Sequence, residues 1–153
     1  MMKALSSRAC LAGLLTLALS GAAFAAQPPA SGLGQSWPNA SDVSSSPNFH
    51  AYVFVLGGIQ YVQINDVNGN VLGAVGTSNG QFITLPIGRF SQQVATPQQA
   101  PAASTSAAPV AAPTTVYQDT ATQVTATPLS DGTMQLKAMA AGCDPIECNT
   151  RYQ

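Results

Sequence analysis

The sequence predicts a small, mainly β protein: an antiparallel meander of about four strands followed by a C-terminal hairpin. Residues 49–90 are rich in Val, Ile, Tyr and Phe, which favour strands. Three dipeptides, Gly57-Gly58, Asn68-Gly69 and Asn79-Gly80, interrupt this stretch at nearly regular spacing. Such dipeptides are preferred at the centre of two-residue hairpin turns, where both positions need a positive φ. The stretch is therefore typical of consecutive antiparallel strands joined by tight turns.

The first 26 residues have the pattern of a secretory signal peptide. Lys3 and Arg8 lie at the start of an apolar run over 9–19, and a small-residue cleavage pattern, Ala-Phe-Ala, follows at 23–25. The run is shorter than the roughly 20 apolar residues that a transmembrane helix needs. We therefore expect an exported bacterial protein without a transmembrane span, either periplasmic or secreted.

Charge is scarce in this chain. Charged residues make up 7% of it, against about 25% in typical soluble domains. Without the signal peptide, Arg89, Lys137 and Arg151 remain against six acidic residues, which is a net charge of −3. Nucleic acids are bound through clusters of Lys and Arg that displace counterions, and three scattered basic residues form no such cluster. The composition therefore argues against a nucleic-acid partner.

Residues 27–48 are predicted to be a disordered arm. They are rich in Pro, Gly, Ser, Ala and Asn, and Trp37 is their only large side chain. Such a segment buries too little apolar area to offset the entropy of ordering its backbone. We therefore expect this arm to be flexible.

The meander is predicted over 49–94. Its strands are expected at 51–56, 59–66, 71–77 and 81–87. The two outer strands, the first and the fourth, carry almost no charge to protect their edges, so they can accept a strand from another chain. Pairing at an edge is therefore one way in which this sheet could bind.

Alternation along the strands gives the predicted sheet two partly apolar faces. With turns at the three dipeptides, Phe54 opposes Tyr61 and Gly76 opposes Ile83, so large side chains lie beside large ones or cover small ones. The first face is predicted to be an interaction face, made of Tyr52, Phe54, Leu56, Ile59, Tyr61, Leu72, Ile83 and Leu85. The other face carries Val53, Val55, Val62, Ile64 and Val75. Because a sheet with two apolar faces is unstable in water, the C-terminal segment, a second copy or a partner protein must cover at least one of them.

Two further segments follow the meander. Residues 95–115 consist mostly of Ala, Pro, Thr, Ser and Gln, and four prolines prevent a helix, so a semi-extended linker is predicted. Residues 116–153 are predicted to form a β-hairpin and a cysteine-containing tail, with the hairpin turn at 130–132. The hairpin either lies on the main sheet or becomes ordered only on binding, and the sequence does not decide between these two predictions.

Cys143 and Cys148 are the only cysteines that remain after removal of the signal peptide. In an exported protein, two cysteines so close together are predicted to form a disulfide. Closing so short a ring contributes only about 2 kcal/mol, enough to stiffen the tail. The alternative is a small-molecule or metal site in which the two thiolates act with Asp144 and Glu147.

The sequence carries no recognisable catalytic motif. His50 is the only histidine, and the common hydrolase, zinc-protease and phosphate-loop motifs do not occur. Residues 66–70 begin like a calcium loop, but Val71 stands where such a loop needs Gly, and a hairpin turn explains them. We therefore expect no enzymatic activity and no cofactor. A small hydrolase centred on His50 remains the alternative.

Together these features predict an exported, non-enzymatic interaction module of the cell envelope or the secreted fraction. Its partner is expected to be a protein, either a second copy of the chain or an envelope component. Binding would bury the apolar sheet face or add a strand at its edge.

Overall fold

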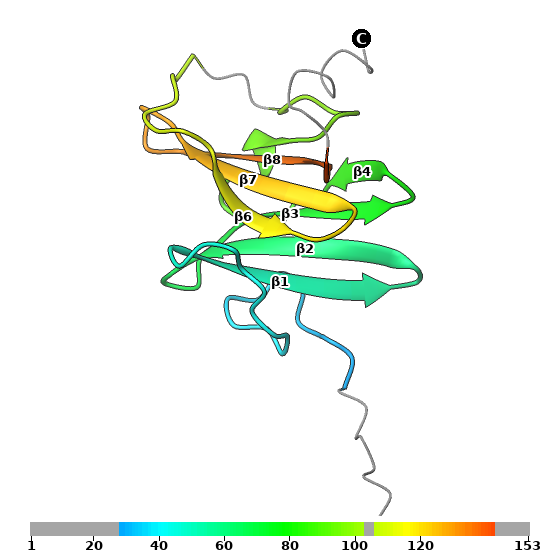
Figure 1. Ribbon diagram of the computed structural model, residues 1–153. Helices are drawn as coiled ribbons and strands as arrows, with labels where there is room; N and C mark the ends of the chain where they lie inside the picture. The colour runs from blue at the N-terminus through cyan, green and yellow to red at the C-terminus, as the bar shows by residue number, and fades with distance from the viewer. Residues whose placement is uncertain (1–27, 103–105, 143–153) are drawn as a thin grey trace, which may run out of the picture.

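The protein is mainly β, as the computed structural model shows for residues 28–102 and 106–142 (Figure 1). The first sheet is the predicted antiparallel meander, with its strands in sequence order. These strands are β1 (Phe49–Leu56), β2 (Ile59–Asp66), β3 (Val71–Ser78) and β4 (Gln81–Thr84). The predicted signal peptide over 1–26 lies outside the described residues, as does the tail from 143 onwards.

The predicted register of the first sheet is confirmed. Phe54 pairs with Tyr61, which pairs with Gly76, and Gly76 pairs with Ile83. The strand lengths agree closely, except that β4 ends at Thr84 rather than at residue 87. Local pairing across short turns was therefore readable from the sequence.

Two of the three turns have the predicted geometry. Gly57 and Gly58 have φ values of 59° and 79°, and Asn79 and Gly80 have values of 51° and 76°, as a type I′ turn requires. The middle turn differs, because among its two central residues only Gly69 has a positive φ, of 82°. The dipeptide rule therefore located this turn correctly and assigned its type wrongly.

The Asp66 carboxylate explains the different middle turn. It accepts hydrogen bonds from the backbone N–H groups of Asn68 and Asn70, each at 2.9 Å, and from the Asn70 side-chain amide at 2.8 Å. Aspartate commonly caps a turn in this way. Gly69 then supplies the one left-handed position, so the loop is longer than a two-residue turn.

A second four-stranded sheet forms from the C-terminal half of the chain. Its order is β5-β8-β7-β6, with β5 parallel to β8 and the remaining pairs antiparallel. The strands are β5 (Val94–Ala95), β6 (Thr114–Gln118), β7 (Thr122–Pro128) and β8 (Met134–Ala140). The predicted hairpin is therefore part of a separate sheet and does not extend the meander.

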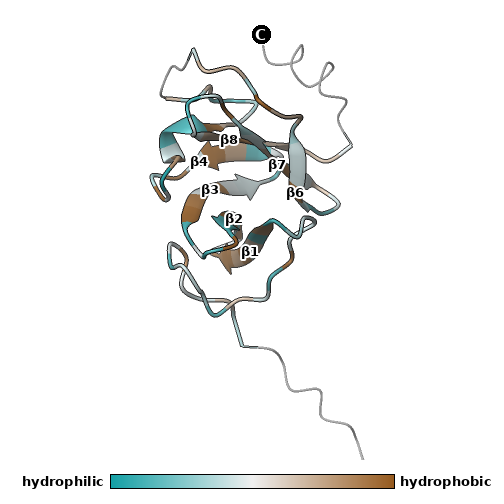
Figure 2. Ribbon diagram, turned by 90° about the vertical axis from the view of Figure 1, so that its left-hand side faces the viewer, coloured by the Kyte–Doolittle hydropathy of each residue, from teal (hydrophilic) through white to brown (hydrophobic). Residues whose placement is uncertain are grey.

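The second sheet covers the valine-rich face of the first. Figure 2, viewed along the strands, shows β6, β7 and β8 stacked against the first sheet. Apolar residues from both sheets form one buried cluster: Ala51, Val62, Ile64, Leu72, Val75, Phe82, Val94, Val116, Tyr117, Val124, Ala126, Leu136 and Ala138. The molecule is thus a β-sandwich, and the C-terminal segment is what covers this face.

Residues 28–48, predicted to be a flexible arm, lie instead along the outer face of the first sheet. Two fully buried amides hold them there. Gln63 Nε2 donates to the carbonyl oxygen of Gln35 at 2.8 Å, and Gln63 Oε1 accepts from the backbone N–H of Gly34 at 2.6 Å. Asn65 Nδ2 donates to the carbonyl oxygen of Ser36 at 2.7 Å. Hydrogen bonding, rather than apolar burial, orders the arm, which is why its composition was misleading.

The last part of the arm bridges the two sheets. The backbone N–H of Val43 donates to Ala51 on β1, and that of Ser45 donates to Val116 on β6, each at 2.9 Å. Residues 42–46 therefore lie between the edge of β1 and the edge of β6. This segment, which we call the strap, covers half of an edge that was predicted to be free.

The predicted linker over 95–115 is also partly built into the fold. The Gln98 side chain accepts from the backbone N–H of Phe82 at 3.2 Å, and the Gln99 side chain accepts from the Thr84 hydroxyl at 2.9 Å. Further on, the backbone N–H of Val110 donates to the last carbonyl of β7 at 3.0 Å. The two glutamines cover the edge of β4, so this edge too is less open than the sequence suggested.

The chain passes from the first sheet to the second directly after Gly88. The backbone N–H groups of Arg89 and Phe90 donate to Val71 and Leu72 at 2.9 and 2.8 Å, so this segment continues along β3 beyond the end of β4. A short 3-10 helix, η1 (Ser91–Gln93), then leads into β5. The packing at Gly88 therefore sets how the two sheets are joined.

Replacing Gly88 by Ala is expected to destabilise the protein more than replacing Gly132. Both have a positive φ, of 98° and 80°, which costs another residue about 1–2 kcal/mol. A Cβ at Gly88 would also lie 2.6 Å from backbone atoms of Leu72 and Gly73, whereas at Gly132 it would meet nothing within 4 Å. We expect Gly88→Ala to lower the free energy of unfolding by about 3 kcal/mol or more, and Gly132→Ala by about 1 kcal/mol. Urea unfolding measures both, and equal losses would contradict this close approach.

Candidate functional site

The structure divides the predicted interaction face into a covered part and an open part. Tyr52, Phe54 and Leu72 are buried within the chain, so they cannot form a surface for a partner. Leu72 was assigned to the wrong face: it belongs to the core between the two sheets, beside the register shift between Ile64 and Asn65. The other five residues of that face are exposed or half-buried: Leu56, Ile59, Tyr61, Ile83 and Leu85. We call these five residues the outer patch. It lies toward the ends of β1 and β3, beyond the part of the face that the arm covers.

The outer patch is apolar and shallow. Leu56 and Ile83 are each 51% exposed, and both face solvent from the same side of the sheet. A small hollow of about 110 Å³ lies among Ile59, Gly76 and Ile83. A Cβ at Gly76 would be 2.9 Å from Ile83, so Ile83 packs directly on the backbone of β3. The patch is therefore a shallow surface whose side chains, such as Ile83, are held by the strand backbone beneath them.

The edge of β1 beside this patch is open at its end, where Val55 and Leu56 are 66% and 51% exposed. The strap pairs with β1 at Ala51 and, through Asp42, at Tyr52, so its pairing stops short of this end. Unpaired strand edges can accept another strand. The open stretch of edge and the outer patch are thus continuous.

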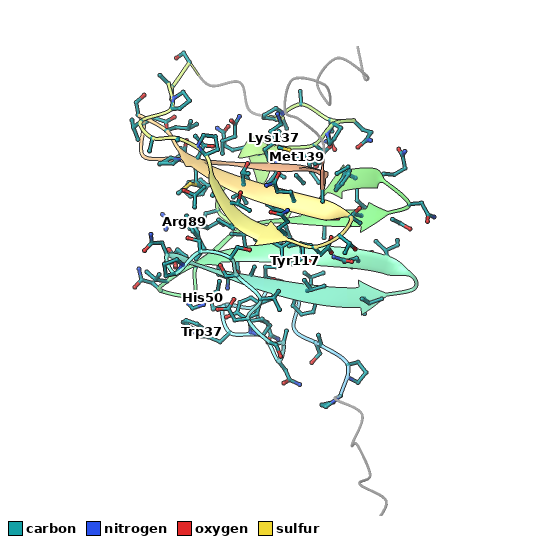
Figure 3. The ribbon with its side chains drawn as sticks, viewed as in Figure 1. Trp37, His50, Arg89, Tyr117, Lys137 and Met139 are labelled. Atoms are coloured by element: carbon teal, nitrogen blue, oxygen red, sulfur yellow. The ribbon has the colours of Figure 1, made fainter. Side chains whose placement is uncertain are left out.

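A polar network lies between the two sheets near the hairpin ends, where sequence reasoning had marked nothing. The Gln60 side chain donates to the hydroxyl of Tyr117 and to the carboxylate of Asp119, each at 2.9 Å. The Tyr117 hydroxyl also donates to Asp119 at 2.7 Å (Figure 3). Because these residues are 57 and 59 positions apart from Gln60, spacing in the sequence could not reveal the network.

The network shifts the pKa values of its two ionisable groups in opposite directions. Burial alone would raise the pKa of Asp119, but hydrogen bonds from Gln60, Tyr117 and the backbone of Ala121 and Thr122 outweigh it and lower the pKa to about 2. Burial and the nearby Asp119 carboxylate raise the pKa of Tyr117. At neutral pH the network therefore holds a carboxylate and a neutral phenol.

An open groove of about 410 Å³ lies beside this network. Val55, Gln60 and Thr77 line it from the first sheet, and Ala121 and Thr122 line it from the second. Its lining has no charged side chain. The groove is an uncharged opening at one end of the sandwich, and Val55 at the open end of β1 is part of its lining.

His50 lies in a second cluster, at the other end of β1. Its Nδ1 is 2.7 Å from the Asp42 carboxylate, which also accepts the backbone N–H groups of Ser44 and Ala51. The imidazole is stacked with Tyr52 at 6.2 Å and meets Trp37 edge-on at 5.3 Å between ring centroids (Figure 3). Burial raises the pKa of Asp42, but these hydrogen bonds lower it by more, so the net effect is a lowered pKa. The cluster fastens the arm to β1.

Other predicted sites fall partly outside what the structure describes. Cys143 and Cys148, with Asp144 and Glu147, lie beyond the described residues, so their disulfide and the alternative metal site stay predictions. Asp66, at the start of the calcium-like segment, is engaged in capping its own turn. Within 28–102 and 106–142, no three His, Cys, Asp or Glu side chains are grouped so as to hold a metal ion.

Comparisons of this chain with protein families, with curated proteins and with solved structures found no match. Among the residues that the structure describes, no helix has the length and apolar character needed to cross a membrane. The candidate surfaces are therefore argued from the residues of this chain itself.

Stability at low pH should depend on Asp119. Because its pKa is about 2 in the folded state and 3.8 is its ordinary value, the carboxylate stabilises the fold above pH 3.8 and loses this effect as the pH falls toward 2. Asp119→Asn is expected to cost about 1–3 kcal/mol at neutral pH and to show a weaker loss of stability between these pH values. Melting temperatures measured from pH 2 to pH 7 test this.

Tyr117→Phe is the matched variant, because it keeps the buried ring and the Asp119 carboxylate and removes only the hydroxyl, with the hydrogen bond that it donates to Asp119 and the one that it accepts from Gln60. It should shift the acid transition to higher pH without abolishing it. Identical pH profiles for the wild type and both variants would show that the network does not stabilise the carboxylate.

Proposed function

We propose that the chain is an exported, non-enzymatic interaction module of the bacterial envelope or secreted fraction, and that its outer patch binds protein. The occupant we propose first is a second copy of the chain. The observation that carries this proposal is the division of one sheet face. The arm covers the part of the face around Gln63 and Asn65, while Leu56 and Ile83 remain half-exposed beyond it.

The energetic argument rests on the apolar area of the outer patch. Burial of apolar surface contributes roughly 25 cal/mol per Å², so leaving two aliphatic side chains and their neighbours in water forgoes a sizeable stabilisation. The sandwich has already buried the opposite face of the same sheet. An apolar surface that persists after folding is a common mark of a protein contact.

Self-association fits the chemistry of this surface. Every residue of the outer patch is uncharged, and so are Ser78 and Gln81, which border its hollow. Two copies can therefore bring these patches together about a two-fold axis without opposing like charges. The open edge of β1 lies next to the patch and offers backbone groups that could extend such a contact.

The two alternatives have narrower support. A metal or small-molecule site in the acidic Cys143–Cys148 loop rests on the sequence alone. A hydrolase centred on His50 is supported by the Asp42–His50 contact, since such a pair orients imidazole in hydrolases. That same contact is accounted for by its role in fastening the arm, so we favour the interaction module.

Ile83→Asp and Leu56→Asp are expected to weaken self-association at least about tenfold while leaving the fold intact, because each places a charge at the centre of an apolar contact. Both positions are half-exposed, so folding should tolerate the change. Val110→Asp is the matched control, since Val110 is 63% exposed and lies away from the patch. Sedimentation velocity over a wide range of concentrations measures the effect.

Two results would contradict this proposal. One is a wild-type protein that stays monomeric at the highest concentration reached. The other is equal weakening by Val110→Asp and by the patch variants, which would indicate a general effect of charge. Circular dichroism of each variant establishes that loss of association is not loss of fold.

A further inference from the structure

The chain has a single tryptophan, and it lies on the surface of the arm. Trp37 is 60% exposed. Large aromatic side chains are usually buried for most of their area, and exposed ones frequently mark contact points. Trp37 is near the turn between β2 and β3, at the opposite end of the strands from the outer patch. Its exposure therefore needs an explanation of its own.

The indole ring is held against the backbone of Gly69. A Cβ at Gly69 would lie 2.6 to 2.8 Å from Cε2, Cζ2 and Nε1, with Cε2 the nearest. These three atoms are adjacent in the ring, so Gly69 lies against one face of the indole. His50 contacts the ring edge-on and is itself held by Asp42. One face of Trp37 is thus seated on the protein, and the ring is fixed in orientation.

The turn on which this ring sits carries two amide side chains. Asn68 and Asn70 stand on either side of Gly69, and both are exposed. The Asn70 amide donates to Asp66 at 2.8 Å, which leaves its oxygen as an acceptor, and the Asn68 side chain makes no hydrogen bond with the described residues. Side-chain amides offer both donors and acceptors. The turn that seats the aromatic ring thus also presents uncharged hydrogen-bonding groups.

The charges near Trp37 favour a neutral ligand. Two carboxylates are linked to Trp37 through its neighbours: Asp42 through His50, and Asp66 through the turn that contains Gly69. Each of them accepts three hydrogen bonds from within the protein. A cation would therefore find these acceptors already engaged, although an aromatic face can attract one. An anion would be repelled by the same two carboxylates, and Arg89, which is near enough to lower the pKa of Asp66, lies over the Phe90 ring.

We propose that Trp37, seated on Gly69 in the turn that also carries Asn68 and Asn70, binds a neutral sugar ring of a glycan. One face of a pyranose ring presents C–H groups that pack on the electron-rich face of an indole, and its hydroxyl groups can both donate to and accept from amides. A rigid platform loses little entropy on binding. This site is separate from the outer patch, so it adds a ligand to the proposed protein interaction.

Fluorescence gives a direct test, because excitation of the single tryptophan reports only on Trp37. The full mature chain is titrated with the tetramer of β-1,4-linked N-acetylglucosamine and, separately, with the tetramer of β-1,4-linked glucose. We expect a saturable change in emission with at least one of them. Isothermal titration calorimetry should show that Trp37→Ala weakens binding at least tenfold and that the double variant Asn68→Ala, Asn70→Ala weakens it several-fold.

Two variants serve as controls for this experiment. Val67→Thr changes an exposed residue of the same turn and should bind as the wild type does. Ile83→Asp alters the outer patch and should also leave sugar binding unchanged, so failure of the protein-interaction proposal is distinguishable from failure of this one.

Three outcomes would overturn the sugar site. The first is the lack of any saturable signal with both oligosaccharides. The second is binding that persists unchanged in Trp37→Ala. The third is tighter binding of a tetralysine peptide than of either sugar, which would assign the exposed indole face to a cationic partner.

Discussion

The structure depends on one constraint: the first sheet is apolar on both faces, and both must be kept from water. The second sheet covers the valine-rich face with its own apolar residues, such as Val124 and Leu136, and this burial forms the core. The opposite face is not covered in the same way, because residues 28–48, which lie on it, have few large apolar side chains. The part of that second face that stays uncovered determines which surfaces are available for binding.

The arm covers part of this outer face, and polar contacts hold it there. Gln63 and Asn65 replace apolar residues in the middle of the outer face, and their buried amides bind the backbone of residues 34–36. A buried amide without a hydrogen-bond partner would destabilise the fold, so the arm stabilises these two side chains as much as they hold the arm in place. Coverage ends where the amides end, and the outer patch begins there.

The two proposed surfaces follow from this division. The outer patch is the part of the face that the arm does not reach, and Trp37 is an arm residue held at the surface by the turn beneath it. They lie toward opposite ends of the same strands, so a protein and a glycan could be bound together. Such an arrangement suits a molecule that connects a protein with a carbohydrate surface.

The local pairing of the chain was decided by its sequence. Gly57-Gly58 and Asn79-Gly80 specify turns with positive φ, and the alternation of residues around them specifies which side chains face each other. These interactions join residues that are close in the chain, so they can be read directly. The apolar character of both faces, and hence the need for cover, was readable for the same reason.

Only the tertiary structure decided which segment covers which face. The contacts that settle this join distant residues: Gln63 with Gln35, Val43 with β1, and Gln60 with Tyr117 and Asp119. Two of these contacts involve the arm, whose composition alone suggests a disordered segment. A hydrogen bond depends on the position and orientation of two groups in space, and neither is contained in the local pattern of a sequence.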